Sequence, residues 1–180
     1  MDLICFSHMK WDFDFQKPQH LLTKFSSVYR IFFIEEPLFN SYEEKFSLIS
    51  AGEGIWVVKL YLTGDKNDSD DNTRQRKLLK TLFAIMNIHR YILWFYTPMA
   101  LPLSDDMTAD LIIYDCMDET ADFKFAPDGY TRLEESLISK SDLIFTGDKS
   151  LYDKKKICIL ANVILNIKEI LNEKIIGSII

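Results

Sequence analysis

The sequence predicts an α/β protein: a single Rossmann-like, doubly wound domain built on a mostly parallel sheet. Short, continuously apolar runs recur along the chain, which is typical of strands that are buried on both faces of a sheet. Segments with a helical spacing of apolar residues lie between these runs, and this alternation is the pattern of α/β folds. With 180 residues, the chain has room for one domain and a short remainder.

Apolar runs mark the expected strands. The run at 55–62, IWVVKLYL, is rich in β-branched and aromatic residues, as strands are. The complete set of expected strands is 3–6, 31–34, 55–62, 91–96, 111–114 and 143–145.

Helices are expected between several of these strands. Pro18 suits the first turn of a helix, because proline fits there without losing a helical hydrogen bond. The polar, acidic stretch 63–73 is expected to be a solvated loop inside the domain. The apolar stripes that define three helices are Leu21, Leu22 and Phe25; Leu78, Leu79, Leu82, Phe83 and Met86; and Leu133, Leu137 and Ile138, while residues 150–156 could begin a fourth.

Composition excludes several classes of protein. The chain is 48% hydrophobic and 27% charged, so it is not a disordered or low-complexity chain. Its net charge of −6 argues against a general nucleic-acid binder. Cys5, Cys116 and Cys158 are scattered and odd in number, which favours a reducing compartment. Without a signal peptide or an apolar run of membrane-spanning length, the expected location is cytoplasmic, with peripheral contact at the inner membrane face left open.

The loop after the first strand is the most informative candidate site, because ligands of open α/β sheets bind beyond the carboxyl ends of the strands. It contains no glycine, so the G-x-G-x-x-G dinucleotide motif is absent. His8 directly follows the strand, and a catalytic and a structural role are equally open for it. Trp11 could stack on the face of a sugar, although aromatic residues here could also cover the core.

Two further positions could carry chemistry. His20 falls in the first turn of the helix that Pro18 begins, where free N–H groups suit a phosphate; it could instead only hydrogen-bond the preceding loop. Asp115 and Asp118 could act together as general base and hydroxyl ligand. They could also chelate a divalent cation, or one of them could cap the next helix.

Five strings, taken together and in order, resemble the N-terminal domain of bacterial GT-B glycosyltransferases of the group 1 or family 4 type. The resemblance is to the branch found in surface-polysaccharide or teichuronic-acid gene sets. The strings are WDFDFQKPQHLL (11–22), FFIEEP (32–37), LWFYTPMALPL (93–103), YDCMDETADFKFAP (114–127) and SDLIFTGDKSLYDKKK (141–156).

The resemblance implies two Rossmann-like domains that face each other across a cleft. The N-terminal domain would hold the acceptor, and the C-terminal domain would bind a nucleotide-sugar donor, with no bound cofactor or metal. Lys17 stands where the pattern usually has arginine, which keeps the charge but loses the bidentate fork. The expected catalytic residues are Asp118, Asp115 and His8, and the expected acceptor- or phosphate-binding residues are Trp11, Gln16, Gln19 and His20.

The last part of the chain departs from this pattern. Residues 1–156 are expected to form the acceptor-side domain, and residues 157–180 a divergent apolar, helical tail. The donor-binding domain is expected to be missing, through a frameshift or a deliberate truncation. The tail would then pack on the domain or pair with a second copy in a homodimer.

The expected function is that of a truncated glycosyltransferase. The parent reaction would transfer a hexosyl group from a nucleotide-sugar to a saccharide or lipid-linked acceptor in cell-surface polysaccharide synthesis, and the chain alone would be inactive. The alternative is a non-catalytic binding or assembly module that pairs with a separate donor-binding domain. A small flavodoxin-like enzyme with a bound nucleotide is a third, weaker hypothesis.

Overall fold

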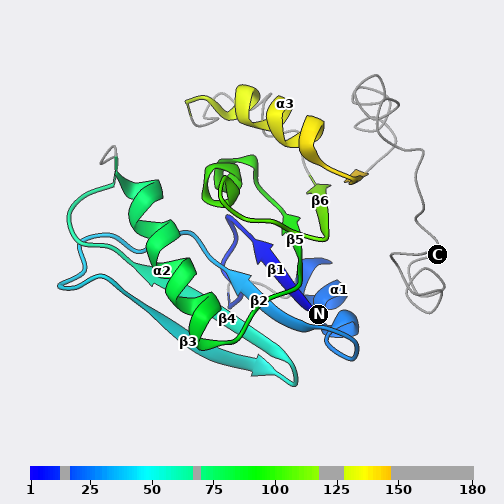
Figure 1. The fold of residues 1–180 in the computed structure, drawn as a ribbon, viewed down its shortest axis with the longest axis horizontal. Helices are drawn as coiled ribbons and strands as arrows, with labels where there is room; N and C mark the ends of the chain where they lie inside the picture. Colours follow the sequence, from blue (N-terminus) through cyan, green and yellow to red (C-terminus); the bar gives the residue numbers. More distant parts are fainter. Residues whose placement is uncertain (13–16, 67–69, 118–127, 147–180) are drawn as a thin grey trace.

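The structure is a computed structural model that describes residues 1–12, 17–66, 70–117 and 128–146 (Figure 1). Its centre is one sheet with the strand order β3-β4-β2-β1-β5-β6-β7. The strands are β1 (Asp2–Phe6), β2 (Arg30–Ile34), β3 (Lys45–Gly52), β4 (Ile55–Tyr61), β5 (Tyr91–Phe95), β6 (Leu111–Cys116) and β7 (Leu143–Thr146).

Helices cover the sheet on both faces (Figure 1). Their bounds are α1 (Lys17–Phe25), α2 (Asp71–Ile85) and α3 (Tyr130–Lys140), and a 3₁₀ segment, η1, spans Pro98–Ser104. One apolar core joins α2, η1 and α3 to one sheet face, and a second core joins α1 to the other. The predicted α/β class, with a Rossmann-like and mostly parallel sheet, is therefore confirmed.

The continuous apolar runs follow from these two cores. Alternate residues of a strand point to opposite faces, so a strand covered on both sides needs apolar residues throughout. In β1, Ile4 and Phe6 enter the core beneath α2, whereas Leu3 and Cys5 enter the core beneath α1. Cys5 and Cys116 are both buried free thiols.

The order of the strands creates a crevice at one edge of the sheet. From β1 the chain crosses to β2 on one side, and later to β5 on the other, and both pair with β1 in parallel. Such a reversal of strand order opens a binding site beyond the carboxyl ends of the central strands. In β1, β2 and β5 these ends are Phe6, Ile34 and Phe95, which are paired in register.

Two features differ from the sequence-based expectation. β3 was not expected; it pairs antiparallel with β4 and forms the edge of the sheet. Helix α2 begins at Asp71, inside the stretch expected to be a loop. The hairpin between β3 and β4 turns through Gly52 and Gly54, whose positive φ angles of 140° and 72° suit glycine.

Several predictions fall outside the described residues. These are the roles of Gln16 and Asp118, the helix at 150–156, and the helical tail at 157–180 with its pairing. None of the helices in the described ranges combines the length and the apolar character that a membrane span needs.

Candidate functional site

A cavity of about 300 Å³ lies at the carboxyl edge of the sheet, on the face that carries α2 and η1. Its floor is the end of the apolar core, with Phe6, Ala100 and Leu103. The volume is at the lower end of the roughly 300–1,000 Å³ of small-molecule sites, so the cavity suits a ligand of about the size of one sugar ring.

The strand ends supply polar groups to this cavity. Ser7 follows β1, Glu35 and Glu36 follow β2, and Thr97 follows β5. The Ser7 hydroxyl accepts a hydrogen bond of 3.0 Å from the Met9 backbone N–H. Thr97 caps η1, because its hydroxyl accepts from the Met99 N–H at 3.3 Å. Ligands of open α/β sheets bind beyond the carboxyl ends of the strands, and the structure brings three such loops together here.

Helix α2 supplies the facing wall, and Gln75 is its innermost polar residue. Gln75 lines the cavity and is only 7% exposed. It lies on the same helical face as the buried Leu79 and Leu82. Within the part of the chain that the structure describes, its amide makes no hydrogen bond. Because the residue is largely buried while its amide is accessible from the cavity, Gln75 is a natural point of contact for a polar ligand.

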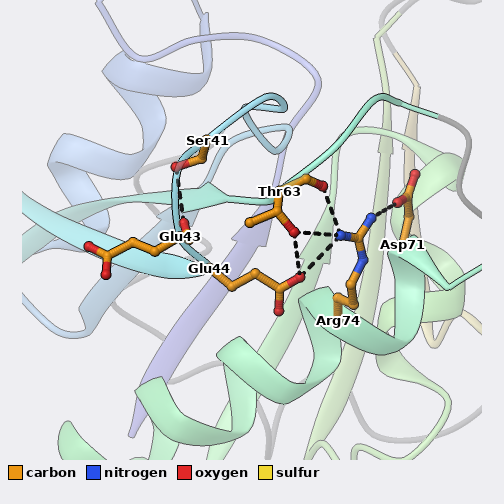
Figure 2. Close-up of polar contacts among 6 residues, drawn as sticks. All are labelled: Ser41, Glu43, Glu44, Thr63, Asp71 and Arg74. Atoms are coloured by element: carbon orange, nitrogen blue, oxygen red, sulfur yellow. Dashed lines mark hydrogen bonds and ion pairs between the residues drawn. The ribbon is translucent and has the colours of Figure 1, made fainter.

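A network around Arg74 fixes the position of this wall (Figure 2). The guanidinium donates to the Thr63 carbonyl at 2.8 Å and to Glu44 Oε1 at 3.1 Å, and it pairs with Asp71. Thr63 follows β4, and Glu44 precedes β3. The network therefore ties the start of α2 to the strands at the sheet edge and holds Gln75 over the cavity.

Glu35 connects the cavity to the loop after β1. Its side chain is 5% exposed, and Oε1 accepts a hydrogen bond of 2.8 Å from the Trp11 backbone N–H. Its other oxygen lies 3.9 Å from Lys59 Nζ, which also approaches Asp12 at 3.7 Å. Glu35 thus fixes the loop with one oxygen while it lines the cavity, a role that sequence analysis did not assign to it.

The predicted acceptor-binding residues that the structure describes, Trp11, Gln19 and His20, lie on the side of the sheet that carries α1 and are not part of the cavity lining. The Trp11 ring packs edge-on against Phe33, with the ring centres 5.0 Å apart. Gln19 is buried, and its side-chain amide donates to the Trp11 carbonyl at 3.0 Å. His20 is exposed on the first turn of α1, and His8 is exposed after β1. Their roles in binding or catalysis stay predictions, with Gln19 placed to position the loop.

Asp115 lies below the surface, on the face of the sheet that carries α1. It is 2% exposed and sits in β6, one residue from the strand end. Burial raises the pKa of the Cys5 thiol well above its usual value of 9.0, and the nearby Asp115 charge adds to this rise. The pKa of the Tyr96 hydroxyl is raised for the same reasons, with burial as the main cause. Asp115 is therefore better placed to position neighbouring groups than to reach a ligand.

Metal binding finds no support in the described ranges. They contain no group of three or more histidine, cysteine or acidic side chains that could hold a metal ion. Glu35, Glu36 and Asp71 line one cavity but do not form such a group.

Comparisons with known proteins place the fold. No protein-family model and no curated protein matches the sequence. A solved structure described as trehalose-6-phosphate from E. coli, bound with UDP-2-fluoro glucose, is similar to this chain with a TM-score of 0.57 and 13% identity. The match covers 91% of this chain and 43% of that chain.

A second similar structure is an alpha,alpha-trehalose-phosphate synthase (UDP-forming) from Burkholderia xenovorans in complex with glucose-6-phosphate. It has a TM-score of 0.46 and 13% identity, over 79% of this chain and 39% of that chain. The chain thus spans less than half the length of either structure. At such identity the likeness to the first structure concerns the fold alone, which is a Rossmann-like α/β domain of the GT-B type.

Proposed function

We propose that residues 1–156 are the acceptor-side half of a glycosyltransferase and that the cavity at the carboxyl edge of the sheet holds the sugar acceptor. The observation that carries this proposal is the cavity itself. Hydroxyl, amide and carboxylate groups converge there, at the crevice where open α/β sheets bind ligands. The fold similarity to a protein bound with UDP-2-fluoro glucose supports this chemistry.

The lining suits a saccharide. Glu35 and Glu36 have carboxylate oxygens that can accept hydrogen bonds from sugar hydroxyls, and the Gln75 amide can both donate and accept. Phe39 and Met99 give the cavity apolar surface for the C–H faces of a sugar ring. A site with a few oriented polar groups on an apolar base is the usual form of a small-molecule site.

In the proposed reaction, an acceptor hydroxyl oxygen bonds to the anomeric carbon of the donor sugar. The bond from that carbon to the nucleoside diphosphate breaks, and the hydroxyl proton passes to a general base. A second Rossmann-like unit would bind the nucleotide-sugar. His8 and Asp118 are the proposed base candidates, with Asp115 as a positioning residue.

The biological setting belongs to the same proposal. The acceptor would be a saccharide or a lipid-linked saccharide of a cell-surface polysaccharide, and the protein would work in the cytoplasm or at the inner membrane face. Pairing of two copies through the 157–180 tail is proposed separately.

Saturation-transfer NMR on the purified 180-residue chain tests the function. A panel of mono- and disaccharides is compared with UDP and with flavin mononucleotide. We expect signals from saccharides that UDP does not displace, because the donor belongs to the other half. Binding of UDP or flavin without binding of any saccharide would contradict the proposal.

A further inference from the structure

We propose that the cavity selects an uncharged sugar unit and discriminates against a phosphorylated one. This inference rests on the proposed function, and it specifies the chemical class of the acceptor group that enters the cavity. Three features of the lining support it: the balance of charges, the acidic residues at the start of α2, which include one of these charges, and the Gln75 amide.

The charges of the lining are mostly negative. Glu35, Glu36 and Asp71 contribute carboxylates, and Lys66 is the one cation among the described residues that line the cavity. The nearest other cations are already paired behind the wall. Lys59 lies against Glu35, and Arg74 is held by Asp71, Glu44 and the Thr63 carbonyl.

Phosphate recognition needs the opposite arrangement. Proteins bind phosphate through arginine forks or several N–H groups, which match its charge and its oxygen atoms. No arginine is part of the described lining. A sugar phosphate would carry a charge of about −1.5 to −2 at neutral pH into a lining with three carboxylates, two of which are ion-paired. Arg74 is shared by Asp71 and Glu44, and Lys59 by Glu35 and Asp12, so carboxylates outnumber cations around the cavity and oppose a phosphate.

The start of α2 could favour an anion, but its own side chains oppose one. A helix N-terminus carries the equivalent of about half a positive charge. Here Asp70 precedes the helix and Asp71 opens it, and Asp71 lines the cavity. These acidic side chains weaken the attraction of the helix N-terminus for a second anion, although Asp71 is ion-paired with Arg74.

Gln75 favours a neutral group that can both donate and accept a hydrogen bond. The residue is largely buried, and its amide reaches the cavity and makes no hydrogen bond within the described residues. A hydroxyl satisfies such an amide, because a hydroxyl group also has one donor and free acceptor sites. A phosphate dianion offers acceptors only, so the amide oxygen would lack a donor wherever the phosphate group itself faced Gln75.

The test compares glucose, mannose and N-acetylglucosamine with their 6-phosphates, by NMR titration of the 180-residue chain. We expect the best neutral sugar to bind at least about tenfold more tightly than its phosphate. Gln75→Met should weaken binding of the neutral sugar by about tenfold, because it keeps a side chain of similar volume but removes the amide. Lys77→Met, at an exposed position of the same helix, is the matched control and should change nothing.

A charge variant isolates the electrostatic part. Glu36→Gln should reduce the ratio between the Kd of the sugar phosphate and the Kd of the neutral sugar by about threefold, because it removes an exposed carboxylate of the lining. Glu53→Gln is the control: it changes the net charge by the same amount as Glu36→Gln, but in the turn between β3 and β4, and should leave this ratio of Kd values unchanged.

The outcomes separate the inference from the function on which it rests. If a sugar 6-phosphate binds as tightly as its neutral partner or more tightly, and Gln75→Met weakens it, the cavity is a sugar site and the inference is wrong. If a neutral sugar binds but Gln75→Met has no effect, the sugar binds elsewhere, and the inference is also wrong. If no sugar binds, the proposed function is wrong, and so is the inference that rests on it.

Discussion

Arg74 is expected to be the residue on which the cavity wall depends most. Its side chain is only 15% exposed, and it joins α2 to the ends of two neighbouring strand segments through Thr63 and Glu44 (Figure 2). Arg74→Met keeps the aliphatic stem and its packing but removes every donor. The variant would leave Asp71 and Glu44 as partly buried carboxylates without this partner.

The magnitude follows from the burial of these groups. A hydrogen bond to a charged group contributes about 1.5–3 kcal/mol, and an exposed ion pair about 0–1 kcal/mol. Asp71 is 15% exposed and Glu44 30% exposed, so the network lies between these limits. We expect a loss of about 2–3 kcal/mol in the free energy of unfolding, which is ~4–12 °C in Tm for a chain of this size.

Urea unfolding followed by far-UV circular dichroism measures this loss. Arg76→Met is the control, because Arg76 pairs with Asp105 at 3.7 Å and only weakly elsewhere, and it should cost less than about 1 kcal/mol. Equal losses for the two variants, or a loss below about 0.5 kcal/mol for Arg74→Met, would refute the role of the network.

The remaining predictions concern pH, thiol chemistry and the loop after β1. In the folded protein, burial raises the pKa of the Cys5 thiol above its usual 9.0 and that of the Tyr114 hydroxyl above its usual 10.0. The free energy of unfolding should therefore be constant up to about pH 9 and fall at higher pH, because these groups ionise first in the unfolded chain. A free energy of unfolding that does not change from about pH 8 to 11 would contradict this. Cys5 and Cys116 should react with iodoacetamide only after unfolding, as peptide mass spectrometry would show, since both are buried. Glu35→Gln should lower stability by about 1 kcal/mol and shift the fluorescence of Trp11, whose backbone N–H loses a charged acceptor; unchanged fluorescence would argue against this link.

Most of the strands could be predicted from the sequence, because a sheet that is buried on both faces needs continuous apolar runs. Residues 31–34 and 91–96 are apolar at every position, and the structure places strands β2 and β5 there. The strand that was missed, β3, lies at the sheet edge and is covered incompletely. Its mixed sequence, KFSLISAG, therefore lacks the continuous apolar signal of the central strands, although the glycines that follow mark a hairpin.

The candidate site was predictable only in part, for a related reason. The loops after strands are identifiable from the strands themselves, so Ser7, Glu35 and Thr97 were within reach. The opposite wall comes from a helix distant in sequence, and its position depends on tertiary packing. One signal for Gln75 was present: it stands four residues before Leu79, as a polar residue on the apolar stripe of α2. A polar residue at such a position indicates a site at the end of a core.

The position of a bound saccharide tests the central claim most directly. Backbone and side-chain amide shifts of the ¹⁵N-labelled chain are mapped during titration with the sugar that binds best. The account predicts that the largest changes occur at Ser7, Glu36, Gln75 and Thr97, around the cavity. Changes confined to Trp11 and α1, with the Gln75 amide unmoved, would contradict it and place the ligand on the opposite face of the sheet.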